Sequence, residues 1–198
     1  MSILLIAGSP SEKSRSSALL DAVEQNLQAR TTAVERLRIR DLSPQALLLA
    51  DWNNISVRQA TAQVERASAL VIATPVYKAA YSGVLKVFLD LLPQTALKGK
   101  TVLPLATGGS PHHMLALDYA LRPVLQSLGA RHVLPGVYAT DSQVPALPEG
   151  GGYAVGEDIS RRLDDGVAAL VQALPAKRLP VVSAQFAPVA FSEVRCSV

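Results

Sequence analysis

Short apolar runs alternate with amphipathic stretches along most of this chain. Apolar runs bounded by glycine or polar residues are typical of buried parallel strands, whereas apolar positions three or four residues apart are typical of helices. The pattern predicts five strands, at residues 2–7, 32–37, 69–73, 101–106 and 131–137. It predicts five helices, at residues 15–28, 56–67, 82–92, 114–128 and 158–174. Residues 41–54, which include Pro44 and Trp52, are expected to form a loop with room for one turn of helix.

Residues at the ends of the predicted helices support these boundaries. Ser14 and Ser56 are suited to cap the first two helices, because a serine hydroxyl accepts a hydrogen bond from a free amide at a helix start. Pro93 ends the third helix, and Gly129 is suited to the position that follows the fourth.

Strands that alternate with helices predict an α/β fold, namely a doubly wound parallel sheet with helices on both faces. The residues alone leave two strand orders open, the Rossmann order and the flavodoxin-like order 2-1-3-4-5. Neither Gly-x-Gly-x-x-Gly after the first strand nor the Gly-Lys-Ser/Thr of a P-loop occurs. These are the usual cradles for a pyrophosphate or a triphosphate, so the pattern favours a ligand with a terminal monophosphate.

Composition and length narrow the class of protein. The 198 residues fit one domain, predicted at residues 1–175, followed by a tail at 176–198. The tail contains an apolar, proline-broken stretch, and two interpretations stay open: packing at a subunit interface, or no packing at all. The formal charge of +3 comes from scattered Lys and Arg, which gives no support to nucleic-acid binding. A single cysteine, Cys196, forms no internal disulfide, and neither an export signal nor a membrane-spanning run is apparent, so we expect a cytoplasmic protein.

Three polar or glycine-rich loops follow the first, third and fourth predicted strands, at residues 8–17, 74–77 and 107–109. In open α/β sheets, ligands bind at the carboxyl ends of the strands, so these loops are expected to line one crevice. The first loop offers serine hydroxyls, Arg15 and a helix N-terminus, which together suit a phosphate monoester. The second offers a stiff backbone and Tyr77, and the third lets backbone approach a ligand closely at Gly108 and Gly109. A planar heterocycle that carries a monophosphate is the expected ligand, and flavin mononucleotide (FMN) fits this description.

The same three segments resemble the NADPH-dependent FMN reductase family, and more narrowly the flavin reductases of two-component alkanesulfonate monooxygenase systems. The similarity runs from about Ile3 to Gln143, and residues 11–13 depart most from the family pattern. The resemblance implies the flavodoxin-like order and hydride transfer from NADPH to FMN. It further implies that reduced flavin passes to a partner monooxygenase in sulfur acquisition. The residues that it places at the flavin are, for the phosphate, Ser9, Arg15, Ser16 and Ser17; for the ring, Pro75, Val76 and Tyr77; and for its far edge, Thr107, Gly108 and Gly109.

Pro123 lies in the middle of the helix predicted at residues 114–128. It cannot donate to the carbonyl of Tyr119, so the helix must either kink or widen locally into a π-bulge. The resemblance favours the bulge, because reductases of sulfonate systems carry an inserted tyrosine at this position, in a π-helix at a tetramer interface. It implies a homotetramer in which Tyr119 contributes to the contact and to flavin release.

Other functions remain as alternatives. One is a quinone, azo-dye or metal-ion reductase that keeps its FMN; another is a flavodoxin-type electron carrier, which the positive net charge disfavours. Hydride transfer between the two cofactors requires no catalytic acid or base, and none is predicted; His112 and His113 are not expected to bind a metal. By loop proximity, Lys78, Lys86 and Arg122 are candidates for binding the 2′-phosphate of NADPH, although solvated surface charge is the simpler explanation for each of them.

Overall fold

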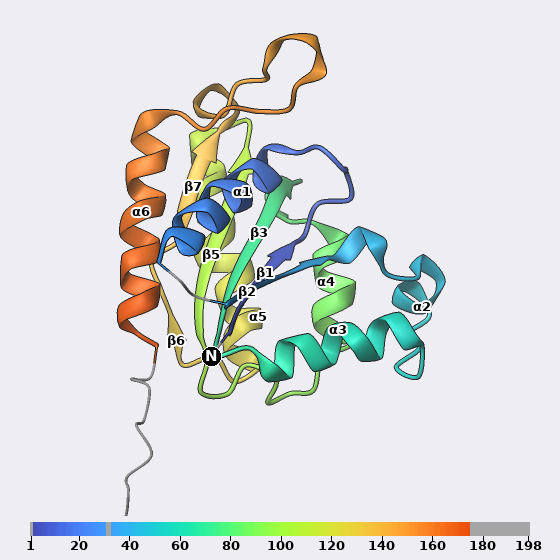
Figure 1. Ribbon diagram of the computed structural model, residues 1–198. Coiled ribbons are helices and arrows are strands. Elements are labelled where there is room, and N and C mark those ends of the chain that lie inside the picture. Colours follow the sequence, from blue (N-terminus) through green and yellow to red (C-terminus); the bar gives the residue numbers. More distant parts are fainter. Residues whose placement is uncertain (1, 31–32, 175–198) are drawn as a thin grey trace, which may run out of the picture.

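A parallel sheet with helices on both faces forms the centre of the molecule (Figure 1). The structure is a computed structural model that describes residues 2–30 and 33–174, so the predicted tail at 176–198 and the end of the predicted domain lie outside the described residues. The strands are β1 Ser2–Ala7, β2 Ala33–Arg38, β3 Ala69–Tyr77, β4 Ala80–Tyr81, β5 Thr101–Gly108, β6 His132–Val133 and β7 Val137–Thr140. The α-helices are α1 Arg15–Ala29, α2 Pro44–Leu48, α3 Ile55–Arg66, α4 Gly83–Asp90, α5 Arg122–Ser127 and α6 Glu157–Gln172. The other helical segments are η1 Ile39–Asp41, η2 Pro111–Met114, η3 Ala116–Leu121, η4 Asp141–Gln143 and η5 Pro148–Gly150.

The strand order is β2-β1-β3-β5-β6, with β7 pairing with β5 beyond the end of β6. When β6 and β7 are counted as one interrupted strand, this is the predicted flavodoxin-like order 2-1-3-4-5. The α/β prediction is therefore confirmed. The numbering differs because the short strand β4 pairs antiparallel with the end of β3 and was not predicted.

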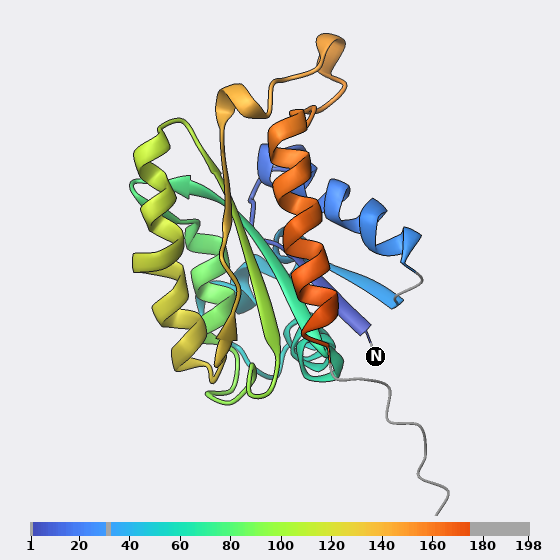
Figure 2. The same ribbon diagram turned by 90° about the vertical axis from the view of Figure 1, so that its left-hand side faces the viewer.

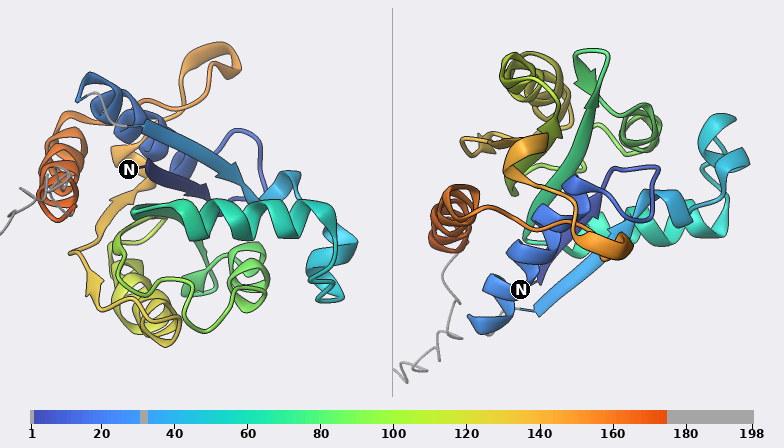
Figure 3. Two further views of the ribbon diagram at one scale, coloured as in Figure 1. Left: turned by 60° about the horizontal axis from the view of Figure 1, so that its bottom comes forward. Right: turned by 90° about the horizontal axis from the view of Figure 1, so that it is seen from above.

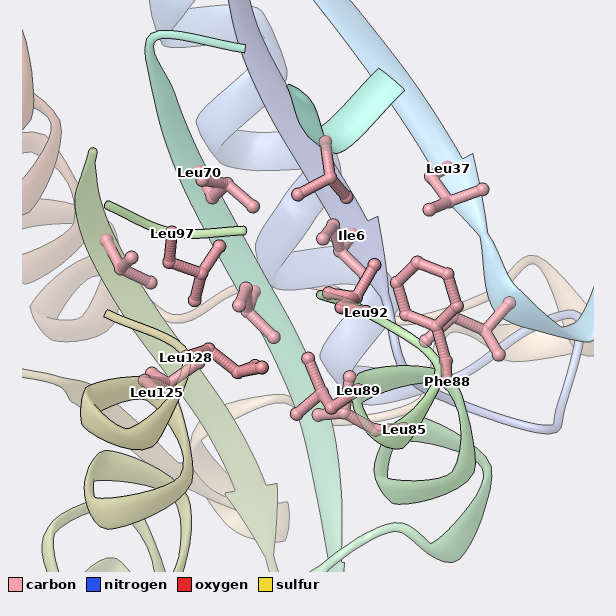
Figure 4. Packing of buried hydrophobic residues seen from close by; sticks show 14 of the residues in the cluster. Ile6, Leu37, Leu70, Leu85, Phe88, Leu89, Leu92, Leu97, Leu125 and Leu128 are labelled. Atoms are coloured by element: carbon pink, nitrogen blue, oxygen red, sulfur yellow. The ribbon is translucent and has the colours of Figure 1, made fainter. Parts of the chain in front are cut away.

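Two helical layers cover the sheet, α1 and α6 on one face and α3, α4 and α5 on the other (Figures 2 and 3). Side chains alternate between the faces along β1: Ile3 and Leu5 pack toward α1 and α6, whereas Leu4 and Ile6 pack toward α3 and α4. Figure 4 shows the core between the sheet and the layer of α3, α4 and α5, where Phe88 of α4 is completely buried among leucine and isoleucine side chains. Both faces of the central strands are covered, which explains their continuous apolar runs.

Two strands extend further than predicted, and this changes the nature of two of the predicted loops. β3 continues through Tyr77 and β5 through Gly108, and Pro75 lies opposite Thr107 in a parallel ladder. The sequence pattern suggested loops because proline and glycine are unusual inside strands. Residues 74–77 and 107–108 are thus held by the sheet.

The fifth predicted strand, at 131–137, is interrupted and runs on to Thr140 as β7. The carbonyl of Val102 accepts a hydrogen bond from the amide of Leu134 at 2.9 Å. Backbone groups two residues apart on a strand point to the same side, so the backbone of Pro104 in β5 faces the same segment. Proline has no amide hydrogen to donate, and pairing between the strands stops there until Leu105 meets Val137.

One other local prediction needs correction, the cap of α3, while the turn of helix allowed for within residues 41–54 is present. Asn54 caps α3 in place of Ser56, because its side-chain oxygen accepts from the amide of Ser56 at 3.0 Å. Residues 41–54 contain the short helix α2, which is capped by Ser43. The predicted cap Ser14 of α1 is confirmed, since its hydroxyl accepts from the amide of Ser17 at 3.1 Å.

Candidate functional site

A cleft of about 210 Å³ opens where β1, β3 and β5 end, and we call it the central cleft. Of the predicted site residues, it is lined by Arg15, Pro75, Val76, Tyr77, Thr107, Gly108 and Gly109. Ser9 and Ser17 instead line a second, adjoining pocket, and Ser16 is buried. The structure therefore brings the three predicted segments to one edge of the sheet, but the predicted ligands Ser9, Ser16 and Ser17 do not line the cleft.

Close packing at Gly8 fixes the path of the chain as it leaves β1. The amide of Gly8 donates to the carbonyl of Ala73 at 2.8 Å, and the Ser82 hydroxyl donates to the carbonyl of Gly8. A Cβ atom at Gly8 would lie 3.0 Å from that Ala73 oxygen and 3.1 Å from Cβ of Leu85, so only glycine fits without displacement. The turn after β1 is thereby held against β3 and α4.

Serine hydroxyls at the start of α1 bond mainly to one another. The Ser14 hydroxyl lies 2.8 Å from that of Ser17 and 3.2 Å from that of Ser16, and the buried Ser9 hydroxyl accepts from the amide of Ser11 at 3.1 Å. The first amides of a helix have no partner within the helix, and the helix dipole places partial positive charge there. The N-terminus of α1 consequently faces the central cleft, through Ser14 and Arg15, with the properties of an anion site.

Arg15 connects the start of α1 to the segment between β7 and α6. Its Nε donates to the carbonyl of Val144 at 3.0 Å and lies 3.6 Å from the Asp141 carboxylate. The guanidinium also lies 4.8 Å from the centre of the Tyr153 ring, a cation–π distance. Lys13 makes a second connection, to the carbonyl of Gly150 at 2.8 Å.

Asp141 and Tyr153 line the central cleft, and the sequence did not predict either of them. They come from residues 141–156, which project beyond the sheet at the top of Figure 1. Most of this segment, including Tyr153, lies past Gln143, where the resemblance ends. The one signal available was its Pro/Gly-rich composition, which predicts a surface loop but not where that loop packs.

The wall made by β3 ends in a tight hairpin. Tyr77 pairs with Ala80, and the two turn residues, Lys78 and Ala79, have φ values of +50° and +62°. The Thr74 hydroxyl accepts from the amide of Ser82 at 3.0 Å and donates to the carbonyl of Pro75 at 2.9 Å, which ties the two arms together. Tyr77, half exposed, stands beside the cleft on a rigid support.

The opposite wall depends on glycine at the end of β5. A Cβ atom at Gly108 would lie 2.8 Å from the Tyr138 hydroxyl and 3.3 Å from Cβ of Val76. That hydroxyl donates to the carbonyl of Ser110 at 2.5 Å, and burial raises the pKa of Tyr138, an effect that the Asp141 carboxylate reinforces. Nδ1 of His113 also lies near Gly108, buried and with no hydrogen-bond partner among the described residues.

The helix that contains Tyr119 is irregular, as its proline requires. Residues Ala116–Leu121 form a π-helical segment, η3, that joins α5 directly before Pro123. Tyr119 is 79% exposed on it, close to the exposed Leu115. The local widening puts a large apolar side chain on the surface next to the β3–β4 hairpin, against which η3 packs.

A flavin site needs a positively charged region for the phosphate, flat apolar walls for the ring, and backbone groups close to the polar edge of the ring. The central cleft offers all of these.

Within the described residues, no group of three potential metal ligands occurs and no helix is long and apolar enough to cross a bilayer.

Comparisons with known proteins agree with this geometry. The family model for NADPH-dependent FMN reductases matches residues 1–144. The chain is 49% identical to an FMN reductase (NADPH) of Escherichia coli strain K12, over 73% of this chain and 75% of that protein. It is 45% identical to an FMN reductase (NADPH) of Pseudomonas putida, over 91% of this chain and 92% of that protein. The apo crystal structure of an NADH:FMN oxidoreductase superposes with a TM-score of 0.80 and 42% identity, covering 89% of this chain and 91% of that chain.

Proposed function

The chain belongs to the NADPH-dependent FMN reductase family, and we propose that it transfers hydride from NADPH to FMN in the central cleft. The observation that carries the proposal is the convergence of Arg15, the residues 75–77 and the residues 107–109 on this one cleft. When bound together, the nicotinamide and flavin rings supply the redox chemistry, so the chain's task is to position them.

Each wall of the cleft has a role in this proposal. The N-terminus of α1, with Arg15 and the Ser14 hydroxyl, holds the FMN phosphate, whereas the predicted ligands Ser9 and Ser17 line the second pocket and Ser16 is buried. Pro75, Val76 and Tyr77 border the isoalloxazine ring along the rigid end of β3. Thr107, Gly108 and Gly109 lie along its far edge, where missing side chains let backbone amides and carbonyls reach the polar rim of the ring.

We propose further that reduced FMN leaves the protein and serves a partner monooxygenase, of the alkanesulfonate type, in sulfur acquisition. The resemblance to reductases of such systems supports this role, as does the exposed Tyr119 on the π-helical segment η3. In the same proposal the protein is a homotetramer whose interface includes Tyr119, and rearrangement there allows flavin to leave. A cytoplasmic location would suit both NADPH and this partner.

Steady-state oxidation of NADPH by the purified protein, with and without added FMN, tests the proposed function. We expect a colourless protein that oxidises NADPH only when free FMN is added. Turnover of quinones, azo dyes or metal ions by a yellow protein without added flavin would favour the flavin-retaining reductase. Absence of NADPH oxidation under both conditions, with FMN tightly bound, would favour an electron carrier.

A further inference from the structure

The second pocket, of about 140 Å³, lies between α1 and β2 and contains a concentration of arginine. It is lined by Arg36, Arg38 and Arg40 together with Ser9, Ser17 and Asp21, among others. Ser11 lines both this pocket and the central cleft, so the two adjoin at residues 8–14. We call it the arginine pocket.

The alternation of side chains along β2 explains how the arginines gather. Arg36 and Arg38 lie two residues apart and therefore face the same side of the sheet, the side covered by α1. Leu37 between them is buried in the core of the other face. Arg40 follows on η1, directly after the strand, and completes the set.

The three guanidinium groups differ in how fully their charge is compensated. Arg36 is paired with Asp21 at 2.5 Å and with Glu24 at 2.9 Å, yet its Nε is buried and lacks a hydrogen-bond partner among the described residues. Arg40 approaches Glu12 and Asp41 only at 3.9 Å, beyond hydrogen-bond distance. Arg38 is exposed and takes part in no ion pair within residues 2–30 and 33–174.

Uncommitted guanidinium groups beside serine hydroxyls are suited to bind a phosphate monoester, because each planar fork can donate two parallel hydrogen bonds to its oxygens. The proposed function involves two such groups, the 5′-phosphate of FMN and the 2′-phosphate that distinguishes NADPH from NADH. The N-terminus of α1 accounts for the first inside the central cleft. For the second, loop proximity suggested Lys78, Lys86 and Arg122.

Of those predicted residues, Lys86 and Arg122 are already engaged. Lys86 pairs with Asp90 at 2.6 Å, while Arg122 pairs with Asp118 at 3.0 Å and donates to the carbonyl of Val133 at 2.8 Å. Lys78 is exposed on the β3–β4 turn and lines neither the central cleft nor the arginine pocket. The arginine pocket is therefore the stronger candidate.

We propose that the arginine pocket binds the 2′-phosphate of NADPH, with Arg38 and Arg40 as its principal ligands, and so selects NADPH over NADH. This inference rests on the proposed function and deepens it. The reductant then spans residues 8–14, with its nicotinamide in the central cleft and its adenosine phosphate on the β2 side. Arg36, held by Asp21 and Glu24, forms the fixed wall of the pocket.

The variant Arg38→Ala tests this assignment, with KM and kcat measured for NADPH and for NADH at saturating FMN. We expect KM for NADPH to rise about tenfold, the loss of a charge-assisted hydrogen bond, with KM for NADH unchanged. Arg58→Ala removes an equal charge from the exposed face of α3, outside the pocket, and is expected to leave both values as in the parent. Glu12→Gln removes an opposing charge from the pocket and should lower KM for NADPH alone.

Equal changes for the two nucleotides in Arg38→Ala, or no change for either, would overturn the assignment. So would weaker binding of FMN with unchanged binding of riboflavin, because the pocket would then hold the flavin phosphate. Inorganic phosphate should compete with NADPH in the parent, and this inhibition should disappear in Arg38→Ala. If the inhibition disappears in Arg38→Ala while KM for NADPH stays as in the parent, the pocket binds a free anion and the assignment fails. A parent that oxidises neither nucleotide with FMN contradicts the proposed function itself, which separates the two failures.

Discussion

The guanidinium of Arg15 and the carboxylate of Asp141 lie 3.6 Å apart across the mouth of the central cleft. Both side chains are partly exposed, at 31% and 49%, so water screens their attraction and the pair is weak. In the proposed complex, a phosphate oxygen of FMN would approach the same guanidinium. A bound FMN phosphate and Asp141 would thus compete for one guanidinium.

Removing that competitor is expected to strengthen FMN binding. In Asp141→Asn, the neutral amide no longer competes for the charge of Arg15 and no longer repels the phosphate, so Kd for FMN should fall about threefold to fivefold, the range for an exposed ion pair. Fluorescence quenching of the flavin measures this. Riboflavin, which has no phosphate, is the control and should bind both proteins equally. Tighter riboflavin binding in the variant would show that Asp141 acts on the ring and would contradict this account.

Gly108 and Gly109 are adjacent, yet the structure predicts opposite tolerance to a methyl group. In Gly108→Ala, the new Cβ would lie 2.8 Å from the Tyr138 hydroxyl, which its bond to Ser110 holds in place. The expected loss of unfolding free energy is about 1–3 kcal/mol, typical of overpacking, with weaker FMN binding. In Gly109→Ala, the nearest atom is an Asp141 oxygen at 3.8 Å, so the loss should be about 0.5 kcal/mol or less. Urea denaturation of the two variants checks the difference, and equal losses would show that Tyr138 yields easily.

The sheet was predictable from sequence because its strands are buried on both faces and leave continuous apolar runs. The ends of two strands were missed, and in both cases a residue that is unusual in strands was the cause. Pro75 hid the end of β3, and Gly108 hid the end of β5. Pairing with the neighbouring strand holds such residues in the sheet. This pairing cannot be predicted from one segment of sequence alone.

The candidate site was predictable only where local composition carried the signal. Hydroxyls and glycines after strands marked residues 8–17 and 107–109. Asp141 and Tyr153 reach the cleft through long-range packing, for which the sequence offers no local cue. In the sequence, the positive charges of Arg36, Arg38 and Arg40 look scattered. Their side chains come together because β2 is a strand with a defined register next to β1, which the sequence does not give.

The β3–β4 hairpin stores strain beside the cleft. Both turn residues have positive φ, as the tight two-residue turn requires, but Lys78 and Ala79 carry side chains that disfavour this conformation. We expect Ala79→Gly to raise the free energy of unfolding by about 0.5–1 kcal/mol, after the greater flexibility of glycine in the unfolded chain is offset. The matched variant Ala80→Gly, one residue on in β4, should lower it by about the same amount. Thermal and urea unfolding would measure both, and destabilisation by both variants would show that the turn is not strained.

Tyr119 offers the test of the proposed link between assembly and flavin release. It exposes 79% of its surface on η3, an unusual position for a large aromatic ring, and a subunit contact would bury it. In Tyr119→Ala, we expect a smaller oligomer by analytical ultracentrifugation and a change in the amount of FMN retained after gel filtration. Trp52→Ala serves as the control, since it removes a ring that is 61% exposed from the segment between α2 and α3, away from the central cleft. An unchanged oligomer with unchanged FMN retention in Tyr119→Ala would leave the π-helical segment without a part in either process, and flavin release would then depend on the cleft alone.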